Sequence, residues 1–107
     1  MKRRLLFIGS KLDGLAAGFR DRRSVIAHIY SGFDMPPQDV LDSTDAAFVF
    51  EVDQFGRFEQ LRRLCHWSRQ HGQIKLIIGY SQNLDACLAE WVEAAGARFV
   101  PLLGGSW

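Results

Sequence analysis

Short apolar runs alternate along this chain with segments in which apolar residues recur at helical spacing. A run of about four to eight residues without a polar face is typical of a strand buried on both sides of a parallel sheet. The strands predicted in this way are residues 5–8, 25–30, 46–50, 74–80 and 98–103. The run at 46–50 leads through Glu51, Val52 and Asp53 into a helical pattern, so we expect it to be the central strand.

Helical periodicity predicts a helix after the first, third and fourth of these strands. The predicted spans are residues 12–22, 54–71 and 84–95, with Gly72 and Gly96 ending the second and third. Ser81 or Asn83 is the expected N-cap of the last helix, and Asp85 adds a favourable charge to its first turn. Between the second and third strands, only one short helical turn over residues 37–41 is expected.

Each of the two later helices has an apolar stripe that is expected to face the core. In the longer helix the stripe is Phe55, Phe58, Leu61, Leu64, Cys65 and Ser68, whereas Arg57, Gln60, Arg63, Arg69 and Gln70 lie largely off it. In the last helix the stripe is Leu84, Cys87, Leu88, Trp91 and Ala95. Cys65 and Cys87, the two cysteines, are therefore expected to be buried, reduced thiols of a cytoplasmic protein.

Strands that alternate with helices predict an α/β fold with a parallel sheet wound on both faces. Right-handed crossovers and five strands favour the strand order 2-1-3-4-5 in a three-layer, flavodoxin-like sandwich. At 107 residues the chain is expected to form one domain, residues 1–107.

Composition narrows the classes of function. The net charge of +1 gives no global field for nucleic acid, so direct nucleic-acid binding is not expected. The longest apolar runs are far shorter than the roughly 20 residues that a membrane span needs, so no membrane partner is expected either. Cys65, His66 and His71 lack the further ligands of a structural zinc site, and no metal or other cofactor is expected.

Ligands of open α/β sheets bind at the carboxyl ends of the strands, where the strand order reverses. The reversal here lies between the first and third strands, and the residues that could line a ligand crevice there are Gly9, Ser10, Asp13, Asp53 and Ser81. Gly9, Ser10 and Gly14 could cradle a phosphate, but the spacing fits neither the dinucleotide-binding fingerprint nor a P-loop, so a plain turn is favoured. Asp53 is a functional carboxylate, a cap of the following helix, or a residue merely solvated at a strand end. No catalytic set of residues can be assembled, and the chain is not expected to be an enzyme.

The layout resembles the receiver domain of two-component response regulators. The stretch FVFEVDQFGRFEQLRRL is similar to the receiver strand that ends in the phospho-accepting aspartate, and LIIGYSQNLDACLAEWVEAAGARFVPLL is similar to the receiver's fourth and fifth strands with the helix between them. The resemblance implies that Asp53 matches the phospho-acceptor and Ser81 the switch hydroxyl. Gap-free spacing back from Ser81 instead places Glu51 at the acceptor position, and the sequence leaves both alternatives open.

The chain also departs from the receiver pattern. Gly9 and Ser10 replace the acidic pair that holds Mg²⁺, residues 100–103 lack the lysine of the last strand, and the final helix is missing. Phosphoryl transfer needs a metal and a cation to neutralise developing charge. We therefore expect a degenerate receiver, a non-catalytic signalling or regulatory module that acts by protein–protein contact, either with another protein or as a homodimer. The alternative is binding of a nucleotide or other small anionic ligand in the crevice.

Four apolar residues are least accounted for by the predicted core. They are Phe33, Met35, Trp67 and Trp107. They form either an exposed patch for a partner or an intramolecular packing of the irregular segment 33–40.

Overall fold

The computed structural model describes residues 3–10, 12, 25–83 and 85–101 of the chain. In chain order the elements are the strands β1 (Arg3–Ile8) and β2 (Val25–Tyr30), the short helix α2 (Gln38–Ser43), the strand β3 (Ala46–Val49), the helix α3 (Phe55–His71), the strand β4 (Leu76–Ser81), the helix α4 (Ala86–Ala95) and the strand β5 (Arg98–Pro101). Except for Leu12, the helix predicted over residues 12–22 lies outside the described residues. Asp13 and Trp107 also lie outside the described residues. The same holds for the other residues after 101, where the sequence predicts that the final helix of a receiver is missing.

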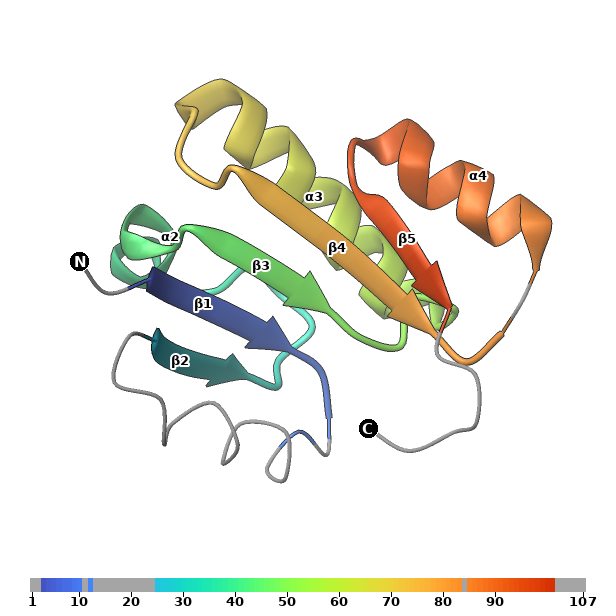
Figure 1. The fold of residues 1–107 in the computed structure, drawn as a ribbon, viewed down its shortest axis with the longest axis horizontal. Helices are drawn as coiled ribbons and strands as arrows, with labels where there is room; N and C mark the ends of the chain where they lie inside the picture. The colour runs from blue at the N-terminus through green and yellow to red at the C-terminus, as the bar shows by residue number, and fades with distance from the viewer. Residues whose placement is uncertain (1–2, 11, 13–24, 84, 102–107) are drawn as a thin grey trace.

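The strands form one five-stranded sheet in the order β2-β1-β3-β4-β5, and every neighbouring pair is parallel (Figure 1). The predicted fold class and strand order are therefore confirmed. Ile8 pairs with both Tyr30 and Val49, and Val49 pairs with Gly79, so the carboxyl ends of these strands lie at one edge of the sheet.

The main core lies between the sheet and the two long helices, which run side by side (Figure 1). It contains alternate residues of the strands and the inner faces of both helices, including Leu6, Ile8, Ala47, Val49, Leu61, Leu64 and Val92. Burial of an aliphatic side chain of this size stabilises the fold by about 1.5–3 kcal/mol. The period-2 geometry of a strand sends the residues between these positions to the opposite face.

A row of aromatic rings crosses that opposite face of the sheet. Phe7 stacks on Phe48 with ring centroids 5.2 Å apart, and Phe50 stacks on Tyr80 at 4.7 Å. Burial raises the pKa of Tyr80 from its usual value of 10.0. These rings belong to a second cluster around the buried Phe7, Leu12 and Phe50, so the sheet buries apolar side chains on this face as well.

The predicted stripe of α3 is partly wrong. Phe55, in the first turn, is 80% exposed, whereas Arg57 and Gln60 are buried. The buried stripe continues through Leu61 and Leu64. Arg57 and Gln60 lie on the core side because the loop after β2 offers hydrogen-bond acceptors there, which offsets the cost of burying polar groups.

The predicted stripe of α4 is also partly wrong. Its buried residues are Leu88, Val92 and Ala95, at the spacing i, i+4, i+7, whereas Cys87 is exposed and Trp91 is 61% exposed. Both exposed residues precede a buried one by a single position, which turns them about 100° away from the core. The N-cap is Asp85, whose carboxylate accepts a hydrogen bond from the Cys87 amide at 2.8 Å, so neither Ser81 nor Asn83 caps the helix.

The ends of the two long helices agree with the sequence. Gly72 and Gly96 adopt positive φ angles of 64° and 109° and terminate α3 and α4 as predicted. Met35 and Trp67 pack partly buried against the main core, whereas Phe33 is 54% exposed. The segment before β3 forms the six-residue helix α2, slightly longer than the turn expected at 37–41.

Candidate functional site

The candidate site lies where β1, β3 and β4 end. Ser10 and Glu51 each follow their strand by two residues, and Ser81 is the last residue of β4. The Phe50 amide donates to the Ile8 carbonyl at 2.8 Å, and the Val52 amide donates to the Tyr80 carbonyl at 3.1 Å. These two bonds hold the segment after β3 between its neighbouring strands.

The strand register decides which carboxylate lies at the level of Ser81. Val49 pairs with Gly79, so Glu51 is two residues beyond β3 just as Ser81 is two residues beyond Gly79. Asp53 lies further along the loop and its side chain is exposed. In this structure Glu51, rather than Asp53, occupies the position that the gap-free alignment gives to the acceptor.

Glu51 is held in place by its backbone and by Ser10. Its φ of 61° is in the left-handed region, which is uncommon for a residue other than glycine. The Ser10 hydroxyl lies 2.8 Å from each oxygen of the Glu51 carboxylate and donates its proton to that group. The half-buried carboxylate is therefore already bonded within the chain.

Arg57 is the charged residue buried most deeply beside Glu51, with a side chain that is 0% exposed. Its Nε lies 3.8 Å from the Glu51 carboxylate and, among the described residues, has no hydrogen-bond partner. Burial lowers the pKa of the guanidinium from its usual value, and the negative charge of Glu51 opposes this shift. The pair places a cation next to a carboxylate that would otherwise be costly to bury.

The outer nitrogens of Arg57 bind the loop that follows β2. Nη2 donates to the Ser31 carbonyl at 2.9 Å, and Nη1 donates to the Gly32 carbonyl at 2.5 Å and to the amide oxygen of Gln60 at 2.9 Å. The Gln60 amide nitrogen donates in turn to the carbonyls of Gly32 and Asp34, at 2.9 and 2.7 Å. Two residues of α3 thus fix one loop.

Phe33 and Tyr30 complete this arrangement. The Phe33 ring lies 4.0 Å from the centre of the Arg57 guanidinium, a cation–π contact. The Tyr30 hydroxyl donates a hydrogen bond to the Asp34 carboxylate, and this bond is the main cause of the raised pKa of Tyr30. The loop between β2 and α2 is therefore tied both to its own strand and to α3.

The sequence-predicted site residues are only partly brought together. Gly9 forms the turn after β1 with a φ of 157°, and a Cβ added there would lie 3.1 Å from the Phe50 Cβ. Ser10 reaches Glu51, the alternative acceptor. Ser81 is fully buried and accepts a hydrogen bond from the Asn83 amide at 2.9 Å. Asp53 does not cap α3, because the N-cap is Gln54.

Arg57 and Gln60 are the site residues that sequence reasoning missed. A signal was present, because Arg57 lies four residues before Leu61 and seven before Leu64, which places it on the same helical face. Because both side chains are polar, the sequence pattern places them off the apolar stripe. Within the described parts of the chain no group of three or more potential ligands is placed to hold a metal ion, and no described helix is long and apolar enough to cross a membrane.

No protein-family model matches the chain, and no curated protein matches it. Among solved structures it is similar to a two-component response regulator from Clostridium difficile, with a TM-score of 0.67 and 12% sequence identity over 99% of this chain and 86% of that one. The fold is receiver-like. The strand order β2-β1-β3-β4-β5 agrees with this likeness.

Two further structures share the arrangement. One is a putative pilus assembly-related protein from Burkholderia pseudomallei, with a TM-score of 0.63 and 16% identity over 91% of this chain and 75% of that one. The other is MppP soaked with the product 2-ketoarginine, with a TM-score of 0.56 and 20% identity over 92% of this chain but only 31% of that one. At these identities the likenesses concern the fold alone.

Proposed function

We propose that the chain is a signalling or regulatory module, a degenerate receiver that acts by protein–protein contact without phosphorylation. The observation that carries the proposal is the internal binding of Glu51. Its carboxylate accepts hydrogen bonds from Ser10 and lies beside the buried Arg57, so the group at the acceptor level is engaged within the chain.

The surroundings of Glu51 support the same proposal. The turn after β1 carries Gly9 and Ser10, which offer no carboxylate to Mg²⁺. Arg57 supplies a cation, but three of its contacts are to the loop after β2 and to Gln60, and these contacts would break if it moved to a phosphoryl group. Phosphoryl transfer depends on preorganised charge at the reacting group, and this site has its charges already paired.

The similar folds of a two-component response regulator and of a putative pilus assembly-related protein are compatible with a partner in signalling or in assembly. Transcription regulation is one signalling role that this proposal allows. The partner under this proposal is another protein or a second copy of the chain. A nucleotide or other anion in the crevice has less support, because the Glu51 carboxylate would repel it and Arg57 is already paired.

The proposal is tested by incubating the chain with Mg²⁺ and acetyl phosphate and measuring its intact mass. We expect no phosphoryl adduct under conditions in which a response-regulator receiver in the same tube is modified. The variants Asp53→Asn and Glu51→Gln serve as controls. An adduct that forms on the parent chain and disappears in either variant would show an acceptor carboxylate and contradict the proposal.

A further inference from the structure

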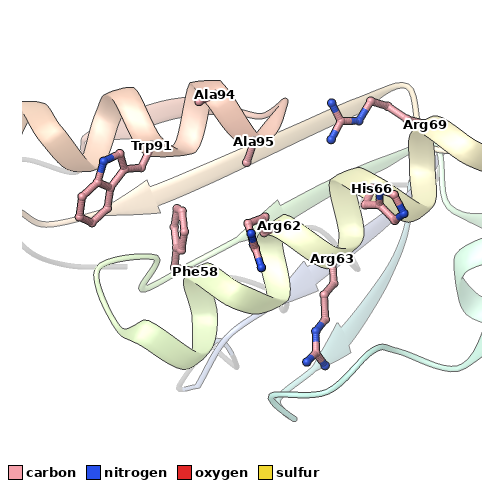
Figure 2. A pocket seen from close by; sticks show the side chains of 8 residues that line it. All are labelled: Phe58, Arg62, Arg63, His66, Arg69, Trp91, Ala94 and Ala95. Carbon is pink, nitrogen blue, oxygen red and sulfur yellow. The ribbon is translucent and has the colours of Figure 1, made fainter.

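A groove runs between α3 and α4 on the outer side of the helical layer (Figure 2). Its volume is about 700 Å³, and it is lined by Phe58, Arg62, Arg63, His66, Arg69, Trp91, Ala94 and Ala95. The α3 residues from Phe58 to Arg69 span about three helical turns, or roughly 16 Å at 1.5 Å per residue. The groove is separate from the candidate site, because none of the residues that bind the Glu51 carboxylate lines it.

The charges along the groove have one sign. Three arginines and one histidine line it, and no carboxylate is among the lining residues. Arg62 pairs with Glu59 of its own helix at 3.1 Å, whereas Arg63 and Arg69 form no ion pair with any residue that the structure describes. Figure 2 shows Arg62 and Arg69 on the side of α3 towards α4, while Arg63 extends away from α4. Of the two arginines that face α4, Arg69 is therefore without an ion pair among the described residues and Arg62 is in an exposed pair, and their positive charge attracts a partner of negative charge.

One wall of the groove is apolar and exposed to water. Trp91 is 61% exposed, and its ring centroid lies 6.1 Å from that of the partly buried Phe58. Ala95 is buried and Ala94 exposed next to it. Exposed tryptophan is enriched at the energetic centres of protein interfaces, because a large ring that becomes desolvated contributes much of the binding energy.

We infer that this groove binds an acidic, amphipathic helical segment of a partner protein. Two features of the groove point to that occupant: Arg62 and Arg69 can pair with carboxylates, and Trp91 and Phe58 can be covered by an apolar face. A helix laid along a groove between two helices matches both features at spacings of three and four residues. About eleven residues of helix match the length of the groove.

A nucleic acid is the other polyanion to consider. The exposed Glu90 and Glu93 lie on α4 next to the lining residues Trp91 and Ala94, and they would repel a continuous phosphate backbone. With a net charge of +1 the chain also lacks the strong positive field that nucleic-acid binding favours. A peptide can place its carboxylates over the arginines and leave these positions to neutral or basic residues.

The inference rests on the proposed function, since it names the kind of partner and the surface that such a contact module would use. It is tested with a phage-displayed library of helical peptides about 14 residues long, selected against the whole chain. We expect the selected sequences to be enriched in glutamate and aspartate at positions three or four residues apart, with apolar residues on the adjoining face. Synthetic copies should shift the amide resonances of α3 and α4 around the groove.

Variants then locate the contact. Arg62→Glu/Arg69→Glu should weaken binding of the selected peptides at least tenfold, and Arg62→Gln/Arg69→Gln should weaken it in the same direction with less disturbance of the fold. Trp91→Ala should also weaken binding. The matched control is Arg3→Glu/Arg4→Glu, which changes the net charge equally at exposed positions of β1 and should leave affinity within twofold.

Three results would overturn the inference. They are selected peptides without acidic enrichment, acidic peptides that bind the charge-reversed variant as well as the parent chain, and a single-stranded oligonucleotide that occupies the groove more tightly than any selected peptide. Each would leave the proposed function standing as a protein contact elsewhere or without phosphorylation. A phosphoryl adduct in the acetyl phosphate experiment would instead contradict the proposed function, whatever binds in the groove.

Discussion

At the scale of single residues, Arg57 joins three parts of the chain. It lies in α3, binds carbonyls of the loop after β2 and pairs with Glu51 after β3. Its positive charge is buried, which is tolerated because the loop carbonyls, Gln60 and Glu51 surround it. No local sequence pattern shows this role, since the carbonyls it binds lie 25 and 26 residues away along the chain.

Arg57→Ala should reduce the free energy of unfolding by about 3 kcal/mol, because it leaves two partly buried carbonyls and a half-buried carboxylate without their partner. Arg57→Lys should give a smaller loss, since lysine keeps the charge but cannot bind two carbonyls with a planar fork. Urea unfolding monitored by circular dichroism provides the measurement. The control is Arg63→Ala, an exposed position of the same helix, where a change within about 0.5 kcal/mol is expected. A loss below 1 kcal/mol for Arg57→Ala would contradict the role assigned to it.

The two cysteines should differ sharply in reactivity. Cys65 is buried, and burial raises the pKa of its thiol from 9.0 to about 11, whereas Cys87 is exposed. At pH 8 about 0.1% of Cys65 would be thiolate, the reactive form. We expect iodoacetamide to modify the Cys65→Ser variant, which keeps Cys87, at least a hundredfold faster than the Cys87→Ser variant.

The same shift sets a direction for stability against pH. Well below pH 9 the thiol is protonated in both the folded and the unfolded chain, so it does not change the free energy of unfolding. As the pH rises from about 9 towards 11, the unfolded chain loses this proton more readily than the folded chain, and the free energy of unfolding falls. The Cys65→Ser variant should lose this part of the alkaline dependence. Equal alkylation rates for the two thiols in the folded chain would show that Cys65 is accessible and that the packing of α3 is wrong.

At the scale of elements, the close packing of α4 and the β3–α3 segment on β4 depends on Gly79. A Cβ added at Gly79 would lie 3.2 Å from a methyl group of Val52 and 3.2 Å from one of Val92. The residue is buried in the middle of β4, so neither neighbour can turn into solvent. The distance between strand and helix is therefore set by the absence of a side chain.

Gly79→Ala should lower the free energy of unfolding by about 1–3 kcal/mol through overpacking. The double variant Gly79→Ala/Val92→Ala should be more stable than the sum of the two single effects predicts, by at least 0.5 kcal/mol, because the smaller residue relieves the contact. Thermal and urea unfolding of all three variants measure this coupling. Additive losses would indicate that Val92 does not restrict position 79.

Elements are also the scale at which the sequence was most informative. The apolar run at 46–50 identifies a buried strand because an inner strand of a parallel sheet has no polar face to confuse the pattern. The run at 25–30 also forms a strand, but it lies at the edge of the sheet and none of its residues is buried. The buried faces of the helices were harder to predict from the sequence. Cys87 and Trp91 fit an apolar face one position away from the one that is buried. Arg57 and Gln60 were assigned to solvent because the carbonyls to which they donate belong to a loop distant in the sequence.

The candidate site was predictable in part for the same reason. Ser10 and Glu51 follow strands, so their place at the carboxyl edge comes from topology alone. Whether Glu51 or Asp53 lies at the level of Ser81 depends on the pairing of Val49 with Gly79, which only the three-dimensional structure shows.

At the scale of the whole molecule, charge is divided between two surfaces with different properties. The carboxyl edge of the sheet holds the paired Glu51 and Arg57, and the groove between α3 and α4 holds cations without carboxylate partners in its lining. In this receiver-like fold the carboxylate at the edge is bonded within the chain, whereas the groove lies on a separate face. Under the proposed function, contact at a helical face replaces chemistry at the edge.

The central claim is that the edge around Glu51 is closed to Mg²⁺ and to a phosphoryl group. The most direct measurement is a two-dimensional amide NMR titration of the whole chain with Mg²⁺ and then with beryllofluoride, which mimics a phosphoryl group. We expect that the resonances of Ser10, Glu51, Asp53 and Ser81 do not move beyond the changes caused by salt alone. Saturable shifts at these amides would show a functional acceptor site and contradict it.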